Sequence, residues 1–214
     1  MMLEPIDAAG VRGILHRPPA RNGDAFALTH SAGSNANAPL LARMAEALAE
    51  AGYLVLRYDL PFRIARAKGP PFPAQASKDR EGIARAVGAL RKLAPGRLFA
   101  GGHSYGGRQT AMAAAENRAL ADALFLLSYP LHPPNKPEQM RTSFFPALRT
   151  PTLIVHGTAD PFSTPEELRA AVAAIPARTE LFAIAGAGHD LKNAPAAAGA
   201  ILARFRALVC YPEN

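Results

Sequence analysis

The chain has 214 residues and a mass of 22.6 kDa, which is enough for one domain with a substantial core. One cysteine cannot form an internal disulfide or a cysteine-based metal cluster, so a disulfide-stapled secreted scaffold is excluded. The sequence is 49% hydrophobic and 19% charged, which is not the composition of a disordered chain. Its apolar runs are far shorter than the ~18–20 residues that a membrane span needs. The N-terminal segment does not have the pattern of a signal peptide, and we expect a cytoplasmic protein.

The formal net charge of +7 raises the question of a nucleic-acid partner. Arginines and lysines are scattered along the chain, and the densest group is Arg57, Arg63, Arg66 and Lys68. Nucleic-acid binding usually requires a concentrated basic face with interleaved aromatic side chains, or a known module, and the sequence has neither. We therefore interpret the charge as a solvated surface and expect no nucleic-acid partner. A weaker interpretation is the attraction of anionic substrates.

Short apolar runs alternate with longer amphipathic segments along the chain. The short runs predict strands over residues 11–17, 25–29, 53–58, 97–100, 124–128, 152–156 and 180–184. The amphipathic segments predict helices over 39–51, from 77 or 79 to 93, and over 106–116, 164–174 and 195–209. Proline- and glycine-rich stretches predict irregular loops over 61–73 and 130–151.

This alternation predicts an α/β fold in one domain, 1–214, with a mostly parallel central sheet and helices on both faces. The 130–151 segment is too short and too rich in proline for a helical cap domain, so we expect none. Ligands of such sheets bind outside the carboxyl ends of the strands, so the loops that follow strands are the places to look for a site.

A candidate nucleophile follows the strand predicted at 97–100. Gly102-His103-Ser104-Tyr105-Gly106 satisfies G-x-S-x-G between a strand and a helix. The serine needs a sharp turn that exposes its hydroxyl, and a Cβ two positions before or after it would clash with the neighbouring strand and helix. The alternative interpretation is a glycine-rich turn with a capping serine.

A serine hydroxyl needs a histidine to accept its proton and a carboxylate to orient that histidine. His189 lies in a glycine-flanked loop between the last strand and the last helix, and Asp160 follows the strand at 152–156. Asp122 precedes its strand and so lies at the wrong sheet edge, and we expect Asp190 to face elsewhere. The order Ser104, Asp160, His189 is the order that a serine–acid–histidine set follows in this type of fold.

An oxyanion hole needs two backbone N–H donors. We expect one from Tyr105 and the other from Ala32, or from Ser31, in the loop after the strand at 25–29. Candidate pocket-wall residues, each equally compatible with ordinary packing, are Phe62, Leu131, His132 and Phe162, together with Tyr105 and Phe144.

Several stretches together resemble a known family. They are LTHSAGSNANAPLL, YLVLRYDLPF, GGHSYGGRQTA, LLSYPLHPPNKPEQMR, PTLIVHGTADPF and GAGHDL. Over nearly its whole length the chain resembles the α/β-hydrolases, and more narrowly their small dienelactone-hydrolase-like branch. That branch includes a testis-expressed hydrolase-like protein and the hydrolase-like domain of a non-specific-lethal chromatin-complex subunit. The resemblance implies Ser104 as nucleophile, Asp160 as acid and His189 as base. Dienelactone hydrolases have cysteine at the nucleophile position, so their substrate does not carry over to a chain with serine.

The predicted function is a serine hydrolase that cleaves a small ester or thioester at an open site, with no metal or organic cofactor. One alternative is a non-catalytic binding protein that keeps the fold. Others are an acyltransferase with the same three residues and a chromatin- or nucleic-acid-associated module. The sequence carries no signal for the oligomeric state.

Overall fold

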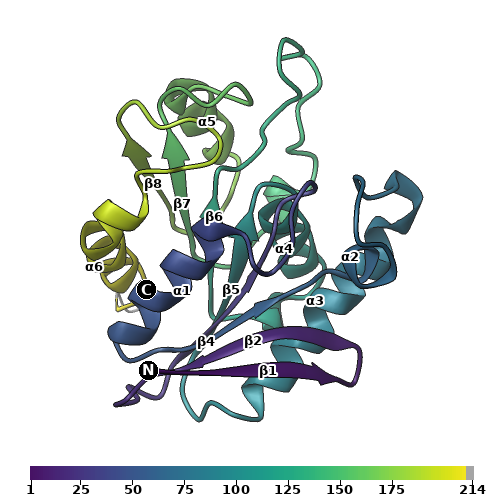
Figure 1. Ribbon diagram of the computed structural model, residues 1–214. Helices are drawn as coiled ribbons and strands as arrows, with labels where there is room; N and C mark the ends of the chain where they lie inside the picture. The colour runs from purple at the N-terminus through teal and green to yellow at the C-terminus, as the bar shows by residue number, and fades with distance from the viewer. Residues whose placement is uncertain (211–214) are drawn as a thin grey trace.

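The computed structural model describes residues 1–210, which are built around one eight-stranded sheet (Figure 1). The strand order is β1-β2-β4-β3-β5-β6-β7-β8. Strands β3 to β8 are parallel, whereas β1 pairs antiparallel with β2 and β2 antiparallel with β4. The bounds are β1 Met2–Ala8, β2 Val11–Arg17, β3 Ala25–Thr29, β4 Leu54–Tyr58, β5 Leu98–His103, β6 Ala123–Leu127, β7 Thr152–Gly157 and β8 Thr179–Ile184.

Helices cover both faces of the sheet (Figure 1). Helices α1 and α6 share one apolar core with the sheet, and α3, α4 and α5 share the core on the opposite face. A short helix, α2, follows β4. Their bounds are α1 Pro39–Glu50, α2 Pro61–Ala65, α3 Ala76–Arg91, α4 Tyr105–Glu116, α5 Pro165–Val172 and α6 Ala198–Val209. The predicted fold class is confirmed, and within residues 1–210 no segment forms a separate cap.

Successive residues of a strand point to opposite sides of the sheet. In the central strands, this alternation places large side chains on one face and small ones on the other. Phe26 of β3, Phe99 of β5 and Phe125 of β6 all surround Phe205 of α6, with ring centroids 4.9 to 5.6 Å from it. On the opposite face β3 and β5 present alanines, which belong to the core shared with α3 and α4. The large aromatic side chains therefore fill the space under α1 and α6.

The structure corrects several predicted boundaries. Residues 2–8 form an edge strand that pairs with β2 through a two-residue turn at Ala9 and Gly10, which have φ values of 53° and 74°. The loop predicted at 61–73 contains α2, whose first residue is Pro61, a position where proline's missing N–H costs nothing. Helix α3 begins at Ala76 without a side-chain cap from Ser77 or Asp79.

Two members of the densest basic group, Arg57 and Arg63, are buried, contrary to the sequence-based interpretation, whereas Arg66 is half-buried and Lys68 is exposed. The side chains of Arg57 and Arg63 are only 5% and 3% exposed. Arg57 donates from Nε to His16 Nε2 at 2.7 Å and from Nη1 to the carbonyl of Ala36. The spacing of arginines along the chain does not show which of them are exposed and which bind backbone carbonyls. Both Arg57 and Arg63 bind to backbone carbonyls in a loop that is distant in the sequence.

No helix among the described residues combines the length and the apolar character needed to cross a bilayer.

Candidate active site

Ser104 lies at the turn between β5 and α4 in a strained backbone conformation. Its φ and ψ are 53° and −116°, and only 8% of its surface is exposed. A non-glycine residue in this region costs on the order of 1–3 kcal/mol and persists only where its surroundings impose it. Here the Ser104 N–H donates to the Leu127 carbonyl of β6 at 2.8 Å, which anchors the turn to the neighbouring strand.

The glycines on both sides of Ser104 allow β3 to pass close to this turn. A Cβ on Gly102 would lie 2.4 Å from the carbonyl oxygen of Thr29, and one on Gly106 would lie 2.4 Å from that of His30. Both clashes are with backbone atoms at the end of β3. The sequence predicted that side chains at these two positions would clash with a strand and a helix. In the structure, both would clash with the end of β3.

The three residues predicted as nucleophile, acid and base meet at the carboxyl ends of β5, β7 and β8. Ser104 Oγ lies 2.8 Å from His189 Nε2, and His189 Nδ1 lies 2.8 Å from Asp160 Oδ2. A carboxylate only accepts, so His189 donates from Nδ1 and its Nε2 accepts from the serine hydroxyl. The hydrogen-bonded chain therefore leads from the hydroxyl to the carboxylate.

Asp160 is held as a carboxylate inside the protein. Its side chain is fully buried, and burial alone would raise its pKa. The hydrogen bond and charge of His189, the Phe162 N–H at 2.9 Å and the charge of His156 outweigh burial and lower the pKa of Asp160. Asp160 is thus ionised at neutral pH and can stabilise a positive charge on His189.

Two rings flank the imidazole of His189. Phe162 packs against one side with ring centroids 4.2 Å apart, and the His103 ring lies 5.2 Å away. Burial, as the largest cause, lowers the pKa of His103 to about 4, so its ring is neutral at pH 7. Its Nε2–H donates to the His189 carbonyl at 2.8 Å. His103 thereby holds the His189 loop, a role that the sequence analysis did not assign to it.

The loop after β3 is tied down by Arg63. Arg63 donates to the carbonyls of Ala32 and Ser34 at 3.0 and 2.8 Å, and to that of Gly69 at 3.0 Å. Each of these bonds occupies a carbonyl oxygen and uses none of the backbone N–H groups of the loop, so Arg63 does not compete with a ligand for those donors. This role of Arg63 could not be predicted from the sequence, because a buried arginine has no signature of its own there.

A cavity of about 510 Å³ opens beside Ser104. Tyr105 begins α4, so its N–H has no partner within the helix, and it lines this cavity together with Ser104 and Ala32. Ser31 lies instead on a neighbouring cavity. The full lining is Ala32, Pro70, Pro71, Phe72, Pro73, Ala76, Ser104, Tyr105, Arg108, Gln109, Met112, Pro130, Arg141 and Phe162.

Of the predicted pocket-wall residues, Phe162 and Tyr105 line this cavity and the others do not. Phe62 is buried and packs edge-on against Tyr105, with ring centroids 5.8 Å apart. Leu131 is completely buried in the core. His132 is buried and bonds through Nδ1 to the Pro133 carbonyl at 2.8 Å. Leu131 and His132 are buried although the preceding Pro130 lines the cavity, so this segment turns into the core directly after the cavity wall.

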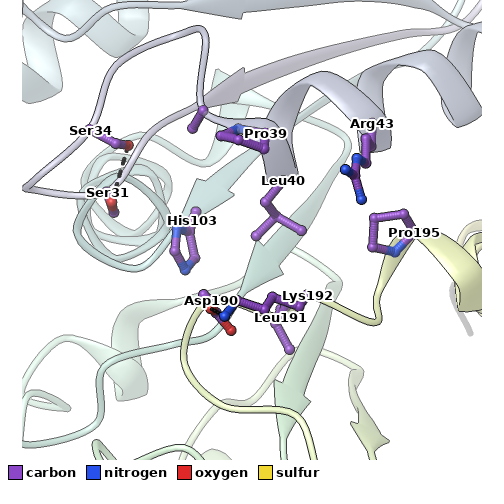
Figure 2. A pocket seen from close by; sticks show the side chains of 11 residues that line it. Ser31, Ser34, Pro39, Leu40, Arg43, His103, Asp190, Leu191, Lys192 and Pro195 are labelled. Atoms are coloured by element: carbon purple, nitrogen blue, oxygen red, sulfur yellow. Dashed lines mark hydrogen bonds and ion pairs between the residues drawn. The ribbon is translucent and has the colours of Figure 1, made fainter.

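A second cavity, of about 470 Å³, lies beyond His103 (Figure 2). The start of α1 with Leu40 and Arg43 forms one wall, and the 190–192 segment forms the other. Asp190 is exposed and pairs with Lys192 at 3.3 Å, so its carboxylate is not bound to His189. Within residues 1–210, no group of three histidine, cysteine or acidic side chains is placed to hold a metal ion.

The other rejected acid also lies away from Ser104. Asp122 accepts from the Leu98 N–H at 2.7 Å, at the amino-terminal edge of the sheet. This is the opposite edge to the one that carries Ser104.

A family model described as an alpha/beta hydrolase domain matches residues 22–201 of the sequence. The chain belongs to the alpha/beta hydrolases. None of the curated proteins compared with this chain matches its sequence.

Solved structures show the same hydrolase fold at low sequence identity. TT1662 from Thermus thermophilus is 21% identical with a TM-score of 0.77, covering 99% of both chains. A dienelactone hydrolase from Anabaena variabilis is 20% identical with a TM-score of 0.75, covering 96% of this chain and 97% of its own. Est1E from Butyrivibrio proteoclasticus is 20% identical with a TM-score of 0.76, covering 99% of this chain and 100% of its own. The chain therefore shares its fold with these structures, one of which is a dienelactone hydrolase.

Proposed function

We propose that the protein is a serine hydrolase that cleaves a small ester or thioester through an acyl-enzyme, with Ser104 as nucleophile, His189 as base and Asp160 as acid. The observation that carries the proposal is the hydrogen-bonded chain from the Ser104 hydroxyl through His189 to Asp160. It begins at a strained turn facing a cavity and ends at a buried carboxylate. A capping serine at a glycine-rich turn would need neither the imidazole nor the carboxylate.

In the acylation step, Ser104 Oγ attacks the carbonyl carbon of the substrate while its proton passes to His189 Nε2. The carboxylate of Asp160 stabilises the imidazolium that results. The tetrahedral intermediate collapses as His189 returns the proton to the leaving alcohol or thiol, which departs and leaves an ester on Ser104. Water then attacks this ester with His189 as base again, and the carboxylic acid and the free serine are released.

The oxyanion of each intermediate needs two donors on one side of Ser104. The Tyr105 N–H at the start of α4 supplies the first, and the helix dipole adds to it. We assign the second to Ala32 rather than Ser31, because Ala32 lines the cavity of Ser104 and Ser31 lines the neighbouring one. Arg63, through the Ala32 carbonyl, keeps this part of the loop in place.

Labelling with a fluorophosphonate, which reacts covalently with an activated serine, tests the proposal. We expect the native protein to be labelled and Ser104→Ala to lose the label completely. Ser77→Ala, which removes an exposed hydroxyl from α3, is the matched control and should label like the native protein. A folded native protein that takes no label, or a Ser104→Ala variant that keeps it, would contradict the proposal.

A further inference from the structure

Two arginines share the cavity of Ser104. Arg108 lies on α4 one turn after Ser104, about 6 Å further along the helix, and its N–H donates to the Ser104 carbonyl at 2.9 Å. Arg141 comes from the irregular segment between β6 and β7. Its backbone is held in place, because its N–H donates to the Leu131 carbonyl at 2.8 Å and its carbonyl accepts from the Tyr129 hydroxyl at 2.5 Å.

Neither arginine is paired with an acidic side chain in residues 1–210, and the cavity lining contains no aspartate or glutamate. Other arginines of the chain do have such partners: Arg97 pairs with Asp24 at 2.8 Å, and Arg80 with Glu116 at 3.0 Å. The Nε of Arg108 is buried and makes no hydrogen bond.

The two guanidinium groups repel each other. Burial first, and then the charge of Arg108, lower the pKa of Arg141. Two like charges held half-buried without a counter-ion carry a desolvation cost that a bound anion would offset. A guanidinium also presents its N–H donors as a planar fork that fits the oxygens of a carboxylate or phosphate.

The rest of the lining is mainly apolar. Pro70, Pro71, Phe72 and Pro73 form one wall, and Met112 and Phe162 lie elsewhere around the cavity. Such walls suit the hydrocarbon part of a small substrate. The arginines are then the charged groups to which a substrate's own charge would bind.

We propose that Arg108 and Arg141 bind an anionic group of the substrate, a carboxylate or a phosphate, so that the enzyme prefers small esters carrying a negative charge near the scissile bond. This inference rests on the proposed hydrolase function. Two arginines of this positively charged chain would then contribute directly to substrate binding, because they line the cavity that contains Ser104.

Two matched substrate sets test this preference. The first varies the leaving group and compares 4-acetoxybenzoate and 4-acetoxyphenyl phosphate with the neutral 4-acetoxybenzamide. The second varies the acyl group and compares mono-4-nitrophenyl adipate with 4-nitrophenyl heptanoate. The measured quantity is kcat/KM for each substrate and each variant, relative to the native enzyme, which removes differences in intrinsic reactivity.

We expect Arg108→Gln and Arg141→Gln each to lower kcat/KM about 10-fold or more for the anionic members of at least one set, because a charge-assisted hydrogen bond is lost. The neutral members should change less than about 3-fold. Arg108→Lys should recover part of the preference because it keeps the charge and loses the fork. Arg149→Gln, which removes an exposed arginine before β7 at the opposite sheet edge, should leave all five rates unchanged.

The possible results distinguish a failure of the anion-binding proposal from a failure of the serine-hydrolase proposal. A loss confined to the benzoate and adipate, or to the phosphate, supports the inference and identifies the anion. Equal effects on anionic and neutral esters would overturn it while leaving the hydrolase proposal intact. If no ester is cleaved, calorimetric titration with 4-hydroxybenzoate and inorganic phosphate decides: binding that Arg108→Gln abolishes supports the anion site, and no binding overturns it.

Discussion

At the scale of single residues, the proposed chemistry depends on where protons and charges are held around Ser104. Asp160 fixes the proton of His189 on Nδ1, which leaves Nε2 to accept from the serine. His103, neutral through burial, holds the backbone of the same loop. One imidazole is therefore kept available for proton transfer while the other serves as a fixed hydrogen-bond donor.

Replacing the buried carboxylate tests this assignment. Asp160→Asn should lower kcat by about 10⁴-fold, because an amide in this place no longer favours the productive tautomer of His189 and cannot stabilise its charged form. Asp190→Asn is the matched control, since Asp190 is adjacent to the same histidine but pairs with Lys192 at the surface. Its kcat should stay within about twofold of the native value. Ester hydrolysis measured on both variants checks the prediction, and the reverse pattern would make Asp190 the acid.

At the scale of secondary-structure elements, the turn from β5 to α4 is tightly constrained by its neighbours. Ser104 has a positive φ, and the turn lies against the end of β3 at backbone contact distance. The glycines at 102 and 106 serve this close approach, since a side chain at either place would meet a carbonyl oxygen. The place of Ser104 at the cavity and the close approach of β3 are thus two results of the same packing.

Two glycine-to-alanine substitutions should have opposite effects on stability. Gly102→Ala places a Cβ 2.4 Å from a backbone oxygen and should lower the free energy of unfolding by roughly 1–3 kcal/mol or more. Gly88→Ala lies on the exposed side of α3 with no atom within 4 Å of the new Cβ. It should raise the free energy of unfolding by roughly 0.5–1 kcal/mol through helix propensity. Urea unfolding measures both, and a Gly102→Ala protein as stable as the native one would contradict the packing argument.

At the scale of the whole molecule, the sheet gathers the site from distant parts of the chain. The ends of β3, β5, β7 and β8 lie at the same edge, so the loops carrying Ala32, Ser104, Asp160 and His189 come together there. At the antiparallel side of the sheet, Arg57 binds His16 in the interior. Burial, and then the charge of Arg57, lower the pKa of His16 to about 4.

The whole protein should therefore lose stability in mild acid. His16 and His103 have pKa values of about 4 when folded and 6.5 ordinarily, so the unfolded chain binds protons first. Their contribution is complete above pH 6.5 and is lost as the pH falls toward 4, at about 3 kcal/mol for each histidine. Urea unfolding at pH 7.5 and pH 4.5 measures the loss. His16→Gln, whose amide oxygen can still accept from Arg57, should show a smaller loss, and an identical pH dependence would contradict the role of His16.

The sequence by itself determined the fold class and the residues that meet at the site. Hydrophobic periodicity depends on local geometry, so the strands and helices followed from it to within a few residues, apart from β1 and α2. The order of Ser104, Asp160 and His189 predicted their meeting because parallel strands end at one edge.

Only the tertiary structure decided which side chains face the cavity and which are buried. Leu131 and His132 are buried, and Arg63 is buried and donates to the carbonyl of Ala32. Arg108 and Arg141 line the same cavity as Ser104. The physical reason is that these positions depend on contacts between segments far apart in the chain. Residue type and spacing do not encode such contacts, since the same arginine can be solvated, paired with a carboxylate or left facing a substrate.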